Sequence, residues 1–197
     1  MKRITQNIPN AITLLNLLAG IFSIVWASEG LYETAAWFIL AAAVCDFLDG
    51  FAARLLKVRS DIGPQLDSLA DLVSFGLAPA YLLVQSNLMI YHSEHTASGL
   101  SSADWGTQFL ILLPLCLPVF ASIRLAKFNL DQRQRSLFIG LPAPAAGLFF
   151  ASLIFCYYRN GFELLSNIVV WDALAIGFSA LMVLPLKMIF FKFQGIK

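Results

Sequence analysis

Charged residues are scarce in this sequence. Lysine, arginine, aspartate and glutamate make up 13% of the 197 residues, about half of what a soluble domain carries. Hydrophobic residues make up 59%, and the mean hydropathy is +0.76. This composition excludes an ordinary soluble protein and predicts an integral membrane protein. The length suits one compact bundle, which we assign to a single domain over residues 1–197.

Cysteine and histidine are also rare, which limits the chemistry available to the chain. The three cysteines lie in separate apolar segments without paired spacing, so we expect no disulfide framework and interpret them as small core residues (Cys45, Cys116 and Cys156). The two histidines, His92 and His95, form only an H-x-x-H pattern in a polar loop, which is a weak metal motif. No secretory signal of the usual shape opens the chain.

Six apolar segments are long enough to cross a bilayer, which takes about 17–25 residues. The sequence therefore predicts an all-α bundle of six transmembrane helices, over residues 11–27, 31–56, 66–90, 107–127, 140–158 and 168–191. Pro114 and Pro118 are expected to kink the fourth span. A short, basic, partly amphipathic lead-in over residues 2–9 predicts an N-terminal interfacial helix on the membrane surface.

Lysine and arginine are distributed unevenly between the loops. If the N-terminus lies in the cytoplasm, Arg159 is the single basic residue on the outer side. The inner side then carries twelve: Lys2, Arg3, Arg54, Lys57, Arg59, Arg124, Lys127, Arg133, Arg135, Lys187, Lys192 and Lys197. By the positive-inside rule, this predicts a multi-pass protein of the inner membrane with a cytoplasmic N-terminus.

Four aspartates lie at the predicted cytoplasmic ends of the second and third segments. Asp46 and Asp49 are three residues apart and share one helix face, and Asp67 and Asp71 are four residues apart on the next helix. The connection over residues 55–64 contains serine, glycine and proline, which suit a tight reversal. We therefore predict antiparallel neighbouring helices whose aspartates converge.

Carboxylates inside a membrane are costly, on the order of 2.5–3.5 kcal/mol for an aspartate at a helix centre. A cluster of four requires a compensating cation, and oxygen-only ligands favour Mg²⁺, Mn²⁺ or Ca²⁺. Four carboxylates can hold two such ions about 3.5–4 Å apart, an arrangement that clamps phosphoryl oxygens. Gly50, Ala53 and Gly63 leave room for a bulky ligand and Arg54 adds a positive charge, so we predict a diphosphate site.

These residues form the pattern D-x-x-D-G-x-x-A-R, eight residues, G-x-x-x-D-x-x-x-D, by which the chain resembles the CDP-alcohol phosphatidyltransferases. The pattern is complete, with Asp46, Asp49, Gly50, Ala53, Arg54, Gly63, Asp67 and Asp71. The resemblance implies a membrane enzyme in which an alcohol displaces CMP from a CDP-linked lipid. It implies two divalent ions per site, Mg²⁺ or Mn²⁺ with Ca²⁺ as an alternative occupant, at Asp46, Asp49, Asp67 and Asp71. It further implies that Asp71 is the general base and that Asp49, Gly50, Ala53, Arg54 and Gly63 line the CDP site.

Within this family, the chain most resembles the membrane-embedded synthases of phosphatidylserine. The resemblance lies in I-P-N-A-I-T-L-L-N-L-L-A-G, L-D-S-L-A-D-L-V-S-F-G-L-A-P-A, R-L-A-K-F-N and G-L-P-A-P-A-A-G, which lie between residues 8 and 147. It implies that CDP-diacylglycerol and L-serine give phosphatidylserine and CMP. We expect Arg124, with Arg133 or Arg135 as substitutes, to bind the serine carboxylate, and Asn129 to contact a substrate. A homodimer in the lipid bilayer is implied, and no nucleic-acid partner is expected.

Other functions stay open from the sequence. Glycerol 3-phosphate or inositol phosphate as acceptor would need a second anion site, which Arg124, Arg133 and Arg135 can supply, whereas choline would need an aromatic cage. An ion-coupled transporter is disfavoured because the aspartates lie at one end of the spans and no internal repeat is present. A metal-stapled bundle without catalysis is the remaining alternative.

Overall fold

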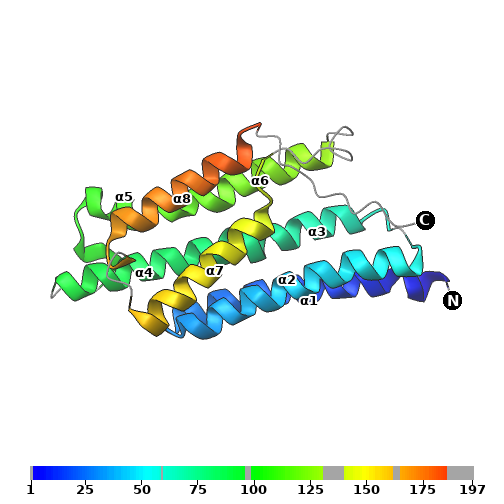
Figure 1. Ribbon diagram of the computed structural model, residues 1–197, viewed down its shortest axis with the longest axis horizontal. Coiled ribbons are helices and arrows are strands. Elements are labelled where there is room, and N and C mark those ends of the chain that lie inside the picture. Colours follow the sequence, from blue (N-terminus) through cyan, green and yellow to red (C-terminus); the bar gives the residue numbers. More distant parts are fainter. Residues whose placement is uncertain (1, 59, 96–98, 131–139, 162–164, 186–197) are drawn as a thin grey trace.

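The computed structural model describes residues 2–58, 60–95, 99–130, 140–161 and 165–185, with backbone only for residues 2–6 and 94. Within these ranges the chain is a bundle of helices without strands (Figure 1). The α-helices are α1 (Lys2–Ser28), α2 (Tyr32–Leu56), α3 (Gly63–Asp71), α4 (Ala78–Glu94), α5 (Trp105–Leu112), α6 (Cys116–Leu130), α7 (Ala143–Asn160) and α8 (Ile168–Val183). Shorter elements are the π-helical turn η1 (Leu72–Leu77) and the 3-10 turns η2 (Leu100–Ser102) and η3 (Leu113–Leu115). The predicted all-α class is confirmed.

Four helical stretches of the described chain are long and apolar enough to cross a membrane: Asn7–Ser28, Tyr32–Leu56, Gly63–Ser93 and Trp105–Leu130. The protein is therefore a multi-pass membrane protein. α8 is apolar but shorter, and α7 is not among the four. The count of six spans stays a prediction, and the end of the sixth predicted span lies outside the described residues.

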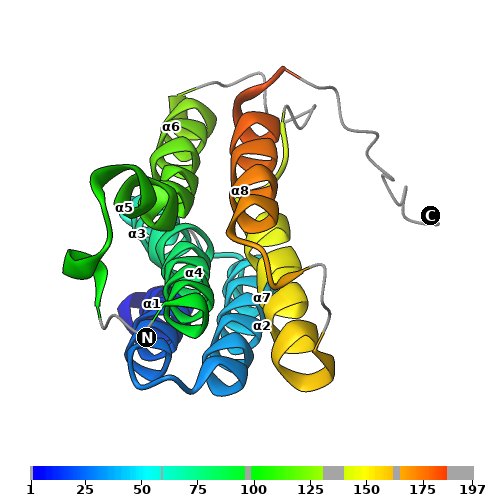
Figure 2. The ribbon, with the colours of Figure 1, turned by 90° about the vertical axis from the view of Figure 1, so that its left-hand side faces the viewer.

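The third stretch forms the centre of the bundle. It consists of α3, η1 and α4 in one continuous run, and 67% of it is buried inside the protein, against about a third or less for the other three stretches. An end-on view places α4 between the α1–α2 pair on one side and α6 and α8 on the other, with α7 beside it (Figure 2). The core around it includes Phe75, Leu82, Leu83, Phe150 and Trp171. The residues of α3 are thus held in place by η1 and α4, the well-packed helical segments that continue from it.

Two local features bear on the sequence-based expectation, and one of them differs from it. The lead-in over residues 2–9 is not a separate interfacial helix, because α1 runs unbroken from Lys2 to Ser28 with Pro9 inside it. Pro9 removes one backbone hydrogen bond near the start of the helix, where water can replace it. The regular α-helix of the fourth span is interrupted at Pro114, which lies in the 3-10 turn η3 that joins α5 to α6, whereas Pro118 lies within α6.

The reversal after α2 is tight, as predicted. α2 ends at Lys57 in the left-handed conformation (φ 51°, ψ 38°), and the amides of Lys57 and Val58 bond back to the carbonyls of Arg54 and Ala53. This is the hydrogen-bond pattern of a helix C-cap. α3 then starts at Gly63 with a proline in its first turn.

Two glycines allow other helices to approach the central run closely. A Cβ on Gly20 of α1 would collide with Ser74, and a Cβ on Gly147 of α7 would lie 2.9 Å from Phe75 Cα. Both contacts fall on η1, the turn that follows Asp71. Glycine at these positions therefore fixes where α3 lies relative to α1 and α7.

Candidate active site

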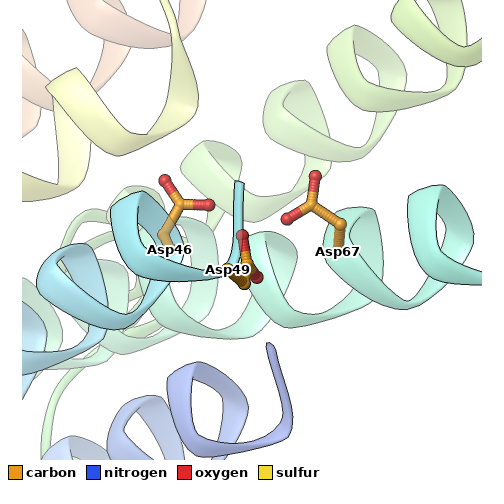
Figure 3. A group of neighbouring side chains, drawn as sticks. All are labelled: Asp46, Asp49 and Asp67. Carbon is orange, nitrogen blue, oxygen red and sulfur yellow. The ribbon is translucent and has the colours of Figure 1, made fainter. Parts of the chain in front are cut away.

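Three of the four predicted aspartates converge between α2 and α3. Carboxylate oxygens of Asp46, Asp49 and Asp67 lie within 4.8 Å of one another. Figure 3 shows Asp46 and Asp67 facing each other, with Asp49 between them. The predicted convergence is therefore present. Both helices also pack against α1.

Asp71 lies one helical turn beyond Asp67 and is buried. Asn16 of α1 donates a hydrogen bond from Nδ2 to Asp71 Oδ1 (3.4 Å). The carboxylates of Asp46 and Asp67 and the guanidinium of Arg124 are its charged neighbours. Asp71 is therefore a buried neighbour of the three-carboxylate cluster.

α1 contributes a contact that the sequence-based prediction missed. Thr13 is buried and its hydroxyl donates a hydrogen bond to Asp49 Oδ2 (2.6 Å). A short bond to an ionised acceptor is a strong one, so Thr13 fixes the orientation of Asp49. The quoted stretch over residues 8–20 contains Thr13 at helical spacing from Pro9 and Asn16, which was the available signal.

A cavity of about 500 Å³ opens beside the carboxylates. This volume is in the usual range for small-molecule sites. Its lining includes the small residues predicted to make room for a ligand and a further set from α1; the residues are Pro9, Asn10, Thr13, Asp49, Gly50, Ala53, Val58, Ser60, Gly63, Pro64 and Asp67. Five of the eight motif residues and three residues of α1 thus line one space.

Three predicted site residues are not part of the cavity lining: Arg54, Asn129 and Arg124. Arg54 is exposed and reaches back over Gly50, with Nη2 4.0 Å from the place of a Cβ. Asn129, at the end of α6, donates from Nδ2 to Ser68 Oγ (2.9 Å) and so ties α6 to α3. Arg124 is buried on α6 and has a charged neighbour in Asp71. Arg133 and Arg135 lie outside the described residues.

The negative charge of the aspartate cluster is not balanced by a salt bridge within the described residues. Within the described residues, the salt bridge present is Arg159–Glu33, and none involves the four aspartates. In the same residues, Asp46, Asp49 and Asp67 form a group of three side chains close enough to bind one metal ion. The carboxylates of Asp46, Asp49 and Asp67 can therefore hold a metal ion.

The three cysteines are free and partly buried rather than fully in the core.

Comparison with known proteins agrees with the motif. The family model for CDP-alcohol phosphatidyltransferase matches residues 6–179. The chain belongs to the CDP-alcohol phosphatidyltransferase family. The match includes α1, which supplies Thr13 and Asn16, as well as the aspartate helices.

Curated relatives within the family have the same name in several organisms. The chain is 36% identical over 151 residues to the CDP-diacylglycerol–serine O-phosphatidyltransferase of Bacillus subtilis, covering 76% of each. It is 33% identical over 180 residues to the protein of that name from Methanocaldococcus jannaschii, covering 91% of this chain and 72% of the relative. The protein of that name from Mycobacterium leprae is 38% identical over 150 residues, which cover 73% of this chain but only 45% of that relative.

Proposed function

We propose that this chain transfers the phosphatidyl group of CDP-diacylglycerol to L-serine, giving phosphatidylserine and CMP. The observation that carries the proposal is the convergence of Asp46, Asp49 and Asp67 beside a cavity of about 500 Å³ lined by the small residues of the family motif. The names of the relatives, at 33–38% identity, support serine as the acceptor.

The carboxylates fit the divalent ions that the family implies. They offer oxygen atoms from two helices, lie within 4.8 Å of one another, and include one held in place by Thr13. We infer that Asp46, Asp49, Asp67 and Asp71 hold two ions, Mg²⁺ or Mn²⁺, with Ca²⁺ as an alternative. Bound divalent ions neutralise negative charge on diphosphate oxygens during displacement.

The cavity suits the CDP moiety. Gly50, Ala53 and Gly63 line it without bulky side chains, and Arg54, whose Nη2 reaches back over Gly50, would offer its positive charge to the diphosphate. The fatty-acyl chains of the lipid would then lie along the apolar helix surfaces that face the membrane.

We infer that Asp71 acts as the general base. The serine hydroxyl oxygen forms a bond to the lipid-side phosphorus, the bond from that phosphorus to the bridging oxygen breaks, and CMP leaves with the bridging oxygen. The hydroxyl proton passes to the Asp71 carboxylate, whose position is set by the amide of Asn16.

Arg124 supports an amino acid as the acceptor. It is buried, and its Nε has no hydrogen-bond partner among the described residues. Asn16 Oδ1 is a buried acceptor without a donor in the same part of the chain. An unpaired cationic donor and an unpaired acceptor near Asp71 match the carboxylate and the ammonium of serine. Asn129 lies nearby on α6, and we retain its substrate contact as a hypothesis.

The charge distribution supports a cytoplasmic site. Arg54 and Lys57, Arg124 and Lys127 lie on the helix segments at the aspartate end of the bundle, whereas Arg159 ends α7 at the other (Figure 1). We infer a protein of the inner membrane with the site and N-terminus in the cytoplasm. We also expect a single domain and a homodimer, as the resemblance implies.

The acceptor is tested with purified protein, CDP-diacylglycerol and Mg²⁺ or Mn²⁺. We expect CMP release with L-serine and loss of that release when EDTA removes the ion. Equal release with glycerol 3-phosphate, inositol phosphate or choline in place of serine would contradict the serine assignment. Ion-driven flux across vesicles without CMP release would favour a transporter.

Replacing Thr13 with valine is expected to weaken divalent-ion binding or activity by about 10–100-fold, the usual effect of losing an outer-shell contact. Valine keeps the shape of threonine but cannot donate to Asp49 Oδ2. Thr13→Ser, which keeps the hydroxyl, is the matched control. Titration of Mn²⁺, followed by the rise in Tm, measures the affinity; equal affinity in the valine and serine variants would show that the bond does not support the ion site.

A further inference from the structure

A second buried polar cluster lies in the half of the bundle away from the aspartate site. Two consecutive residues of the central helix, Ser86 and Asn87, are fully buried there. Tyr158 of α7 donates its hydroxyl to Ser86 Oγ (3.2 Å), and Asn87 Nδ2 donates to Asp172 Oδ1 of α8 (3.1 Å). The central helix thus holds both later helices through adjacent side chains, and Figure 2 shows α7 and α8 beside α4.

The two pairs differ in how well their polar atoms are satisfied. Ser86 accepts from Tyr158 and donates to the carbonyl of Leu82 (3.0 Å), so that its hydroxyl has both a donor and an acceptor as partners. Asp172 is only 4% exposed, yet its Oδ2 has no hydrogen-bond partner. Asn87 Oδ1 also lacks one. Two facing side chains therefore each leave a buried acceptor oxygen without a donor.

An ionised Asp172 does not suit this arrangement. A carboxylate and an amide oxygen are both acceptors, and a buried charge with one neutral hydrogen bond is costly in a membrane protein. In the part of the chain that the structure describes, no lysine or arginine forms a salt bridge with Asp172. Nor does Asp172 belong to a group of three metal-binding side chains there. A proton on Oδ2 supplies the missing donor and removes the charge.

We propose that Asp172 carries a proton and forms with Asn87 a neutral acid–amide pair that fastens α8 to α4. In this pair the amide donates to one carboxyl oxygen and the acid hydroxyl on the other oxygen donates to the amide carbonyl. Two parallel hydrogen bonds in a low-dielectric interior hold the helices without burying a charge. The pair lies apart from the four site aspartates and does not depend on the proposed reaction.

The protonation state is read by infrared difference spectroscopy of the full-length protein, wild type minus Asp172→Asn. We expect the lost signal to be the C=O stretching band of a protonated carboxylic acid at neutral pH. Loss of carboxylate stretching bands instead would overturn the proposal, whether a water or a cation lies beside the ionised group. Both proteins are measured at the same Mg²⁺ concentration, so that the bands of the site aspartates cancel in the difference spectrum.

Asp104→Asn is the control for the spectroscopy. Asp104 caps α5 and is exposed, and hydrogen bonds from the Thr107 hydroxyl and from the backbone amides of Thr107 and Gly106 hold its pKa below the usual value. Its difference spectrum must therefore show carboxylate bands.

Stability provides a second measurement. Asparagine at position 172 can make the same two bonds to Asn87, because one N–H of its amide takes the place of the acid hydroxyl and its carbonyl oxygen takes the place of the other carboxyl oxygen. We expect Asp172→Asn to keep the wild-type Tm and Asp172→Leu to lower it by several degrees, since leucine leaves both polar atoms of Asn87 unpaired. Destabilisation by asparagine equal to that by leucine would contradict a neutral pair.

Discussion

Replacing Asp71 with asparagine is expected to lower CMP release by about 10²–10⁴-fold, the usual contribution of a general base, while CDP-diacylglycerol still binds. Asparagine has the size of aspartate but cannot take up the serine proton. The three-carboxylate group of Asp46, Asp49 and Asp67 stays intact in this variant. Single-turnover rates and binding of CDP-diacylglycerol, measured on the same preparation, separate the chemical step from substrate binding.

The matched control is Asp61→Asn, which changes an exposed aspartate in the connection between α2 and α3. It removes the same charge ten residues away and is expected to leave the rate unchanged. Near wild-type turnover by Asp71→Asn would show that another group accepts the proton. Recovery of the wild-type rate by Asp71→Asn at saturating Mn²⁺ would assign Asp71 to the ions alone, without a role in proton transfer.

The sequence predicted the acidic site well because the aspartates recur at helical spacing. The intervals between Asp46, Asp49 and Asp67 put the carboxylates on facing sides of two helices, and the structure brings these three together. Charge scarcity and the apolar segments gave the helical membrane class. Both inferences rest on local rules, helix periodicity and hydropathy, which do not need the tertiary arrangement.

Features that depend on packing could not be read in the same way. Thr13 and Asn16 look like isolated polar residues in an apolar helix, and their partners Asp49 and Asp71 are 36 and 55 residues away in the chain. The resemblance to the family pointed to the stretch over residues 8–20, but not to the contacts that Thr13 and Asn16 make with the aspartates.

The π-helical turn η1 also has no signal in the sequence. Its hydrogen bonds, with one extra residue in the turn, depend on what surrounds Leu72–Leu77. Here the surroundings are Ser74 bonded to the backbone carbonyl of Asn16 (2.9 Å) and Phe75 against Gly147. Short helical irregularities of this kind are frequent at functional sites, and this one follows directly after Asp71.

Gly147→Leu is expected to have the largest effect of any substitution outside the acidic cluster. A Cβ at this position would lie 2.9 Å from Phe75 Cα, and the nearest atoms include backbone, which cannot rotate away. α7 must therefore move from η1, and overpacking of this kind costs about 1–3 kcal/mol. Because η1 continues directly from α3, we expect a lower Tm together with reduced CMP release.

Gly177→Leu makes the same substitution in α8, where no atom lies within 4 Å of the added Cβ. This variant is expected to keep the wild-type Tm and rate, since the new side chain meets open space on a helix of the same apolar character. Comparing the two variants removes any general effect of leucine in a membrane helix. If Gly147→Leu behaved like Gly177→Leu, close contact between α7 and η1 would not be what positions Asp71, and the placement of α3 would have to depend on its contacts with α1 and α6.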